Sequence, residues 1–381
     1  MKLLHTSDWH LGMTVRGGVN YEDDQKFFIN EICKIAKEEN VDGIMIAGDI
    51  FDKSIASSEA IKLYDDTVTR ICADMNIPVF IIAGNHDGAE RISQCNELLK
   101  KSGLYIAGSL TEKPQVVNKG DVDIYLLPWI STDKVRAVYP DKKDEISSME
   151  DAYRVVLDKY RESFKDGHKN ILVAHAYIVD GQTSESDMAA IVGQATMVGS
   201  DVFEGFDYVA LGHLHGPQKI NDKIRYSGTP MPYSFGKEEK QEKSVVIIDT
   251  ESLEQKVIPL ELLHKRCTLK GTYRELMDAD HDKDILDAYV RLEVTDSYVG
   301  PDLMAAFMEK YGNLVEAKGK DYDKADASIT MTLEDLEKAT TDPEIVFKQY
   351  FKDMIGGEVD DHYTELFKEA LDEYEKGVIE E

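Results

Sequence analysis

Histidine, aspartate and asparagine side chains recur in short motifs directly after apolar segments of this sequence. Five motifs hold them: Asp8-Trp-His10, Gly48-Asp49-Ile-Phe-Asp52, Gly84-Asn85-His86-Asp87, His175 and Gly212-His213-Leu-His215. Because ligands bind open α/β sheets at the carboxyl ends of their strands, we expect these motifs to meet in one crevice. A lone histidine such as His175 is more often an ordinary core or surface residue, but five of the ten histidines belong to this pattern.

These side chains offer imidazole nitrogens, carboxylate oxygens and an amide oxygen as metal ligands. That mixture suits Mn²⁺, Fe²⁺ or Zn²⁺ better than Mg²⁺ or Ca²⁺, which prefer shells of oxygen alone. Seven ligands suffice for two metal ions if one carboxylate bridges, and Asp49, which ends a predicted buried strand, is the natural bridge. Two ions about 3.5–4 Å apart can hold a phosphate and lower the pKa of a bridging water. The predicted reaction is therefore phosphoester hydrolysis.

Short apolar segments with many β-branched residues must position these motifs. We predict buried strands at residues 2–5, 43–47, 79–83, 123–127, 170–174, 208–211 and 244–248. Helical patterns separate the first three, with one apolar face formed by Phe27, Phe28, Ile32, Ile35 and Ala36 and another by Ile61, Tyr64, Val68 and Ile71. This alternation indicates an α/β domain. Fewer helices separate the later strands, so we expect a second sheet and a layered α/β/β/α core.

The pattern changes after Lys265. An alternating strand at 289–294, a helix near 301–311 and a strand at 327–332 predict a small α+β capping domain. The end of the chain predicts a helical hairpin, whose first helix has Asp342 as its N-cap and Pro343 at its first position and ends at Gly356-Gly357. That hairpin could pack on its own domain or dock a partner helix. The expected domains are 1–265, 266–335 and 340–381.

The composition is that of a globular, multi-domain protein. The chain has 381 residues, 42% of them hydrophobic, and its longest apolar runs are far shorter than a bilayer span. Four dispersed cysteines and no recognisable secretion signal favour a soluble cytoplasmic protein. The net charge of −29, taken alone, argues against nucleic acid binding. However, residues 321–381 hold 19 acidic and 6 basic side chains, so nearly half of the excess lies in the tail.

The order of the motifs and the residues in them resemble those of the calcineurin-like metallophosphoesterase superfamily. Within it, the chain resembles the SbcD family, the nuclease subunits of bacterial SbcCD complexes. The strings that carry this resemblance are Thr6-Ser-Asp-Trp-His-Leu-Gly12, Glu22-Asp-Asp-Gln25, Ala83-Gly-Asn-His-Asp87, Phe206-Asp-Tyr-Val-Ala-Leu-Gly-His-Leu-His-Gly-Pro-Gln218, and Tyr226-Ser-Gly-Thr-Pro230 followed by Tyr233-Ser-Phe235. The resemblance covers the whole nuclease region and continues, with weaker motifs, to Glu381.

The resemblance implies a role for each site residue. One metal ion would be held by Asp8, His10, Asp49 and His215, and the other by Asp49, Asn85, His175 and His213. His86 would be the catalytic histidine, which stabilises charge on the phosphate and protonates the leaving oxygen. Asp52 could orient His86, or it could form an Asx turn that closes the loop.

The resemblance also implies an activity and partners. Activity in the family is manganese-dependent and comprises 3′ to 5′ exonuclease action on duplex DNA and endonuclease action on single strands and hairpins. An SbcC-type ATPase with a coiled coil would bind residues 340–381 and gate this activity. A homodimer would form through nuclease-domain helices, with a helix at 88–99 as the candidate. We expect the chain alone to bind DNA weakly, because the partner would provide most of the affinity for duplex DNA.

Two departures and two rival interpretations remain. Ser186-Asp187-Met188 stands where the family commonly has Ser-Glu-Arg, and Met231-Pro232 where it has Leu-Lys, so two positive charges near the expected site are missing. The rival enzyme interpretation is a generic phosphatase or nucleotide phosphodiesterase of the same superfamily. Protein phosphatases of that group place Arg-Gly after the second motif and Glu after Gly-Asn-His, whereas this chain has Lys53 and Asp87. A non-enzymatic adaptor is disfavoured because every ligand position is filled.

Overall fold

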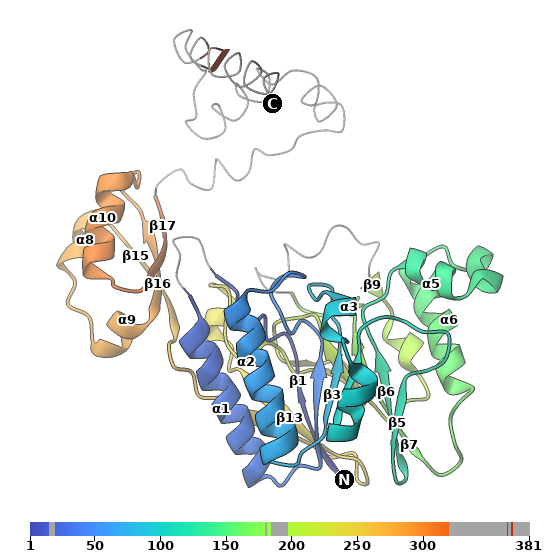
Figure 1. Ribbon diagram of the computed structural model, residues 1–381. Helices are drawn as coiled ribbons and strands as arrows, with labels where there is room; N and C mark the ends of the chain where they lie inside the picture. Colours follow the sequence, from blue (N-terminus) through green and yellow to red (C-terminus); the bar gives the residue numbers. More distant parts are fainter. Residues whose placement is uncertain (15–19, 180, 184–196, 320–363, 365–366, 369–381) are drawn as a thin grey trace, which may run out of the picture. The chain divides into compact units, whose positions relative to one another are not determined.

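The computed structural model describes residues 1–14, 20–179, 181–183, 197–319, 364 and 367–368 (Figure 1). The chain divides into two compact units, Met1–Thr268 with Asp282–Val290 and Leu269–His281 with Arg291–Glu381. The predicted strand at 327–332, nearly all of the predicted hairpin at 340–381 and the departure at 186–188 lie outside the described residues.

Six strands form the first sheet, in the order β14-β13-β1-β2-β3-β4. Their bounds are β1 (Lys2–Thr6), β2 (Gly43–Ala47), β3 (Val79–Ile82), β4 (Leu104–Ala107), β13 (Ser244–Asp249) and β14 (Gln255–Pro259). Strands β1 to β4 run parallel, while β13 is antiparallel to β1, with Leu4 opposite Ile247. The carboxyl ends of four strands therefore share one edge of this sheet.

A second six-stranded sheet has the order β11-β12-β10-β7-β6-β5. Its strands are β5 (Val116–Lys119), β6 (Val122–Leu127), β7 (Lys169–His175), β10 (Tyr208–Gly212), β11 (Gln218–Lys219) and β12 (Ile224–Tyr226). The four neighbours β6, β7, β10 and β12 are parallel. A separate parallel pair consists of β8 (Tyr177–Ile178) and β9 (Met197–Val198).

The two sheets pack face to face around a buried apolar layer. Phe80 and Ile82 from the first sheet meet Ile124, Val173 and residues like them from the second. Helices α1 (Glu22–Glu38) and α2 (Ser58–Thr69) lie on the outer side of the first sheet, and α5 (Thr132–Val138) and α6 (Met149–Arg161) cover the second (Figure 1). All seven predicted strands are present, and the predicted layered α/β/β/α core is confirmed.

Side-chain caps mark the start of α2, α5 and α6, whereas α1 begins without one. The Ser57 hydroxyl accepts a hydrogen bond from the Ala60 amide at the start of α2, and Ser148 and Asp151 form a capping box on α6. The predicted apolar face of the second helix is partly wrong, because Ile61 is 51% exposed while Val68 is buried. A π-helical turn (Arg70–Asp74) continues α2 and buries Ile71.

The single helix predicted at 88–99 is also wrong. The chain forms two short helices instead, α3 (Ala89–Ile92) and α4 (Asn96–Leu99), separated at Cys95, whose φ is 57°. The Asn96 side chain donates to the Ile106 carbonyl oxygen at 2.7 Å and accepts from the Ile106 amide at 3.2 Å. These bonds attach α4 to β4. The predicted helix is therefore interrupted between α3 and α4.

The chain from Arg266 to Lys318 forms a small α+β fold with a three-stranded sheet, β15-β16-β17. Its elements are β15 (Arg266–Gly271), α8 (Tyr273–Asp278), α9 (Lys283–Asp287), β16 (Tyr289–Val294), α10 (Pro301–Lys310) and β17 (Leu314–Lys318). The predicted strand and helix correspond to β16 and α10. Short 3₁₀ turns lie at Lys100–Ser102, Pro140–Glu145, Ser200–Phe203 and Glu238–Lys240. No helix in the described part of the chain combines the length and apolar composition of a bilayer span.

Candidate metal centre

The chemistry-bearing motifs follow the carboxyl ends of five parallel strands. Asp8 and His10 follow β1, Asp49 follows β2, Asn85 and His86 follow β3, His175 ends β7, and His213 and His215 follow β10. Strands β1 to β3 belong to one sheet and β7 and β10 to the other. The structure therefore brings together side chains from both sheets at one end of their shared core.

Four of these residues have left-handed backbone conformations. The φ angles are 53° at Asp8, 44° at His10, 50° at Asp49 and 106° at His213. Such angles are unfavourable for residues other than glycine and persist where the surrounding structure holds them. Here the backbone amides of Asp8 and His10 donate to the carbonyl oxygens of Gly48 and Asp49, both at 3.0 Å. Strain of this kind is typical of functional sites.

Glycines let the strand ends approach one another at the centre. A Cβ atom on Gly84 would collide with the Asp49 carboxylate and backbone, and one on Gly212 would collide with the Ala47 carbonyl oxygen. The loops after β2 and β3 can therefore approach this closely only because Gly84 has no side chain, and the two sheets only because Gly212 has none.

His175, Asn85 and His213 form one half of the cluster. His175 Nδ1 donates to the Ala47 carbonyl oxygen at 2.8 Å, so its Nε2 faces the cluster. The Asn85 Oδ1 atom lies 2.9 Å from His175 Nε2 and 3.1 Å from His213 Nδ1. The two imidazole nitrogens are themselves 3.3 Å apart.

His10 and His215 form the other half, and Asp49 lies between the halves. The Nε2 atoms of His10 and His215 are 3.2 Å apart. Asp49 Oδ2 lies 4.0 Å from His10 Nε2 and 3.3 Å from His175 Nε2, so one carboxylate faces ligands of both halves. Asp8 completes the cluster: its carboxylate accepts the His213 amide at 2.9 Å and the Ser7 hydroxyl at 2.5 Å.

His86 is anchored beside the cluster through the backbone. Its amide donates to Asp49 Oδ1 at 2.9 Å, and its ring Nδ1 donates to the Asp52 carbonyl oxygen at 2.8 Å. The His86 and His10 rings are 4.9 Å apart between centroids. Asp52 thus contacts the His86 ring through its main chain, whereas the sequence suggests a side-chain role.

Burial and mutual charge perturb the acid-base properties of the cluster. Burial raises the pKa of Asp8 to about 6 and lowers the pKa of His213 to about 3. Burial alone would lower the pKa of His175, but the facing Asp49 carboxylate outweighs it and raises that pKa to about 9. In turn, the imidazoles of His175 and His10 overcome the burial of Asp49 and hold its pKa far below the usual range.

The spacing of the ligand atoms suits divalent cations. Ligands about 2.0–2.2 Å from a cation lie about 3 Å from one another, close to the 2.9–3.3 Å separations measured within the two halves. Two sets of three ligand atoms lie within 4.8 Å of one another, His10 with Asp49 and His86, and Asp8 with Asp49 and His175. Asp49 belongs to both sets. The residues therefore fit a divalent metal centre.

Several supporting residues were not predicted from the sequence. The Asp87 carboxylate accepts the backbone amides of Ile50, Phe51 and Gly84, and so ties the β2 and β3 loops together. Trp129 stacks on His213 with ring centroids 5.4 Å apart and planes inclined by 19°. Asp87 belongs to one of the sequence motifs, but the sequence did not indicate its role. Trp129 lies two residues after β6, in a segment with no motif that would have predicted a contact with the site.

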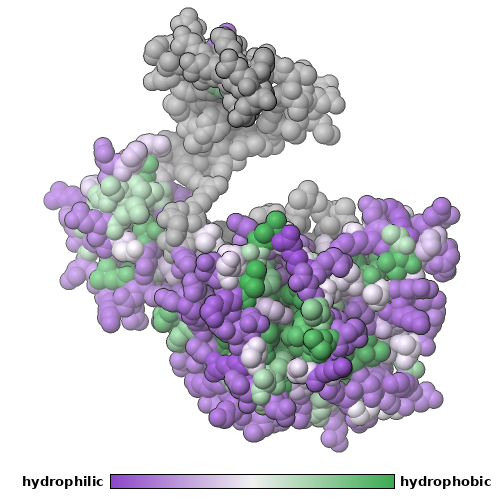
Figure 2. Space-filling model, in the orientation of Figure 1, coloured by the Kyte–Doolittle hydropathy of each residue, from purple (hydrophilic) through white to green (hydrophobic). Residues whose placement is uncertain are grey.

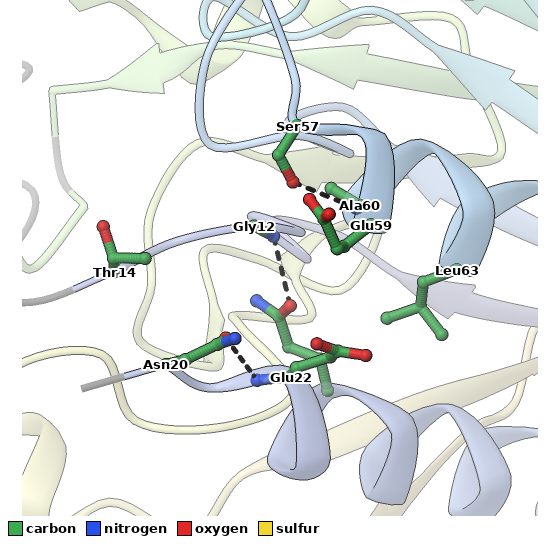
Figure 3. A pocket seen from close by; sticks show the side chains of 9 residues that line it. Gly12, Thr14, Asn20, Glu22, Ser57, Glu59, Ala60 and Leu63 are labelled. Atoms are coloured by element: carbon green, nitrogen blue, oxygen red, sulfur yellow. Dashed lines mark hydrogen bonds between the residues drawn. The ribbon is translucent and has the colours of Figure 1, made fainter. Parts of the chain in front are cut away.

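A cavity of about 230 Å³ lies near the loops that follow β1 and β2 (Figure 3). Its lining includes none of the predicted site residues and consists of Gly12, Thr14, Asn20, Glu22, Gln25, Ser57, Glu59, Ala60 and Leu63. Among the described residues that line it, two are glutamates and none is basic, so the charge of this described lining disfavours a phosphate. We therefore place the chemistry at the histidine cluster.

The chain belongs to the calcineurin-like phosphoesterase family, whose model matches residues 1–217. This membership confirms the predicted fold class and the predicted enzyme class, a phosphoester hydrolase with divalent metals. A second model, described as the Type 5 capsule protein repressor C-terminal domain, matches residues 264–354.

Curated relatives match almost the whole chain. A protein of Staphylococcus epidermidis, named as the D subunit of the nuclease SbcCD, is 29% identical over 375 residues, which are 97% of each chain. A Staphylococcus saprophyticus protein of the same name is 29% identical over 384 residues, covering 100% of this chain and 99% of its own. These matches confirm the resemblance drawn from the motifs.

Solved structures match the chain in part. One, described as TT1561 of Thermus thermophilus, is 13% identical and covers 68% of this chain and 99% of its own, with a TM-score of 0.41. The fold assignment rests on the family match and the strand order, and not on this partial likeness.

Proposed function

We propose that this chain is the nuclease subunit of an SbcCD-type, ATP-driven complex that processes DNA ends in repair, recombination and replication. In this proposal it hydrolyses phosphodiester bonds with two Mn²⁺ ions, as a 3′ to 5′ exonuclease on duplex DNA and an endonuclease on single strands and hairpins. The observation that carries the proposal is the convergence of the other predicted ligand side chains around the Asp49 carboxylate.

Each residue has a stated task in this proposal. Asp8, His10 and His215 hold one cation, Asn85, His175 and His213 hold the other, and Asp49 bridges them. Bound cations supply Lewis acidity to the phosphate and lower the pKa of a coordinated water. His86, with Nδ1 held by the Asp52 carbonyl, presents Nε2 to donate a proton to the leaving oxygen.

The substrate class is tested by a direct comparison. Purified full-length chain with Mn²⁺ should cleave a hairpin DNA and hydrolyse a nitrophenyl phosphodiester, and an SbcC-type partner should increase only the DNA reaction. Hydrolysis of a phosphate monoester without any cleavage of DNA would favour the rival interpretation, a generic phosphatase.

Cation binding should release protons at neutral pH. Metal ligands must be deprotonated, and the pKa values of about 9 for His175 and about 6 for Asp8 mean that at pH 7 mainly His175 must lose a proton. Mn²⁺ affinity should therefore rise by up to about tenfold per pH unit from pH 6 to pH 9 and level off above that. Calorimetric titration at pH 7 in two buffers with different ionisation enthalpies should give about one proton released; no release would contradict this.

The proposed partner is an SbcC-type ATPase, bound through residues 340–381. Deleting these residues should abolish co-purification with the partner and leave Mn²⁺ binding unchanged, because every proposed metal ligand lies before residue 216. Co-expression pull-down and metal analysis measure the two properties. Undiminished capture of the partner by the truncated chain would refute the role of the tail.

We also propose a homodimer through the nuclease domain and a cytoplasmic, nucleoid-associated location. Figure 2 shows a mostly hydrophilic visible face with apolar side chains around the α2 and α3 region. Large apolar side chains exposed in or beside the helices there are Ile55 (68%), Ile61 (51%) and Leu98 (64%). Exposed apolar side chains can mark a protein interface where they form one patch, and Leu98 lies within the 88–99 segment that we name as the dimerisation candidate.

A further inference from the structure

A buried ion pair lies directly behind His215. Glu238 and Lys243 have fully buried side chains, and Lys243 Nζ lies 3.0 Å from Glu238 Oε2. Lys243 immediately precedes β13, whose first residues lie beside the carboxyl end of β1 in the antiparallel pair. The sheet register therefore brings this lysine to the end of the core that holds the metal ligands.

The ammonium group of Lys243 holds the main chain of the metal site. Nζ donates to the His215 carbonyl oxygen at 3.0 Å, to Thr229 Oγ1 at 2.8 Å and to Glu238. These three acceptors match the three N–H groups of an ammonium ion. The Lys243 ammonium group, with all three N–H groups hydrogen-bonded, thus fixes the position of the His215 backbone.

The Glu238 carboxylate faces the ring of the same histidine. Its Oε1 atom lies 3.6 Å from His215 Nδ1 and accepts the Ser234 hydroxyl at 2.6 Å, while Oε2 accepts the Tyr233 amide at 3.0 Å. The 3.6 Å separation is longer than a hydrogen bond, but it places negative charge against the ring nitrogen opposite the cluster-facing Nε2. Tyr233 packs against His10, with ring centroids 5.6 Å apart.

Resting on the proposed function, we propose that Glu238 and Lys243 are positioning residues that set the cation affinity of the His10/His215 half of the centre. A carboxylate behind a ligand imidazole orients the ring and raises its basicity, and losing such a partner typically costs about 10–100-fold in metal affinity. A buried ion pair also carries a large desolvation cost, so stability alone is a weak reason to retain it. The His175/His213 half is held instead by the Ala47 carbonyl and Trp129.

The test separates positioning from simple stabilisation. Glu238→Gln alone removes the negative charge that faces the buried Lys243 ammonium and should lower the melting temperature, whereas Glu238→Gln with Lys243→Met removes both charges and should recover much of that loss. In Mn²⁺ titrations of the full chain, both variants should bind one of the two ions about 10–100-fold more weakly. The matched control is Asp222→Asn with Lys219→Met, which removes an exposed ion pair of 2.6 Å and should change neither property.

A mutant cycle assigns the effect to His215. Adding the double substitution to His215→Ala should cost no further affinity, whereas adding it to His213→Ala should cost the full loss of about 10–100-fold. Wild-type affinity in the stable double variant, or additive losses with His215→Ala, would overturn the inference while leaving the proposed function intact. If the wild-type chain binds no Mn²⁺, the proposed function itself fails, and this inference with it.

Discussion

Replacing Asp49 with asparagine should abolish cooperative binding of two Mn²⁺ ions and reduce phosphodiester hydrolysis by on the order of a thousandfold or more. The Asp49 carboxylate is buried and faces His10 in one half of the centre and His175 in the other. Cation stabilisation of transition-state charge amounts to several kcal/mol, and about 1.4 kcal/mol corresponds to a tenfold change in rate.

Two measurements check the Asp49 prediction. Equilibrium dialysis against Mn²⁺ gives the number of ions bound, and single-turnover cleavage of duplex DNA gives the chemical rate. Asp66→Asn is the matched control, because this exposed carboxylate pairs only with a surface lysine among the contacts described, at 2.9 Å, and should leave both quantities unchanged. If Asp49→Asn binds as many Mn²⁺ ions as the wild type and cleaves DNA at the same rate, Asp49 does not bridge the two ions.

Replacing His86 with alanine should reduce cleavage about 10²- to 10⁴-fold while leaving the Mn²⁺ content at the wild-type value. His86 lies within ligand distance of His10 and Asp49, so the geometry alone also allows it to be a metal ligand. The two roles give different results. A proton donor lost from the site slows the reaction without releasing cations, whereas a lost ligand lowers Mn²⁺ affinity.

The control for His86 uses its contact with Asp52. Because His86 Nδ1 donates to the Asp52 carbonyl oxygen, Asp52→Ala keeps that bond and should change the cleavage rate by less than about threefold. Equal cleavage by His86→Ala and the wild type would end the assignment of His86. A large loss in Asp52→Ala would restore a role for the carboxylate.

The strands and their terminal motifs were predictable because their signals are local. Buried β-branched segments such as Val79–Ile82 are short and sharply bounded, and the polar residues that follow them are unusual at the end of an apolar run. Parallel pairing then places such residues at one edge, so the convergence of Asp8, Asp49 and Asn85 followed from topology alone.

The parts that sequence did not reveal depend on tertiary contacts. The helix expected at 88–99 is interrupted because Asn96 bonds to the backbone of β4, and no local pattern announces such a bond. Asp52 acts through its carbonyl oxygen, which every residue has. Glu238 and Lys243 look like surface residues in a charged loop, and only the antiparallel pairing of β13 with β1 buries them beside His215.

The most direct test of the central claim is the Mn²⁺ stoichiometry of the purified chain, measured together with cleavage of DNA. We predict two Mn²⁺ ions per chain, and cleavage of DNA phosphodiester bonds that appears as the second ion binds and disappears on chelation. DNA cleavage that persists after complete removal of divalent cations, or a chain that binds no Mn²⁺ at all, would contradict the account.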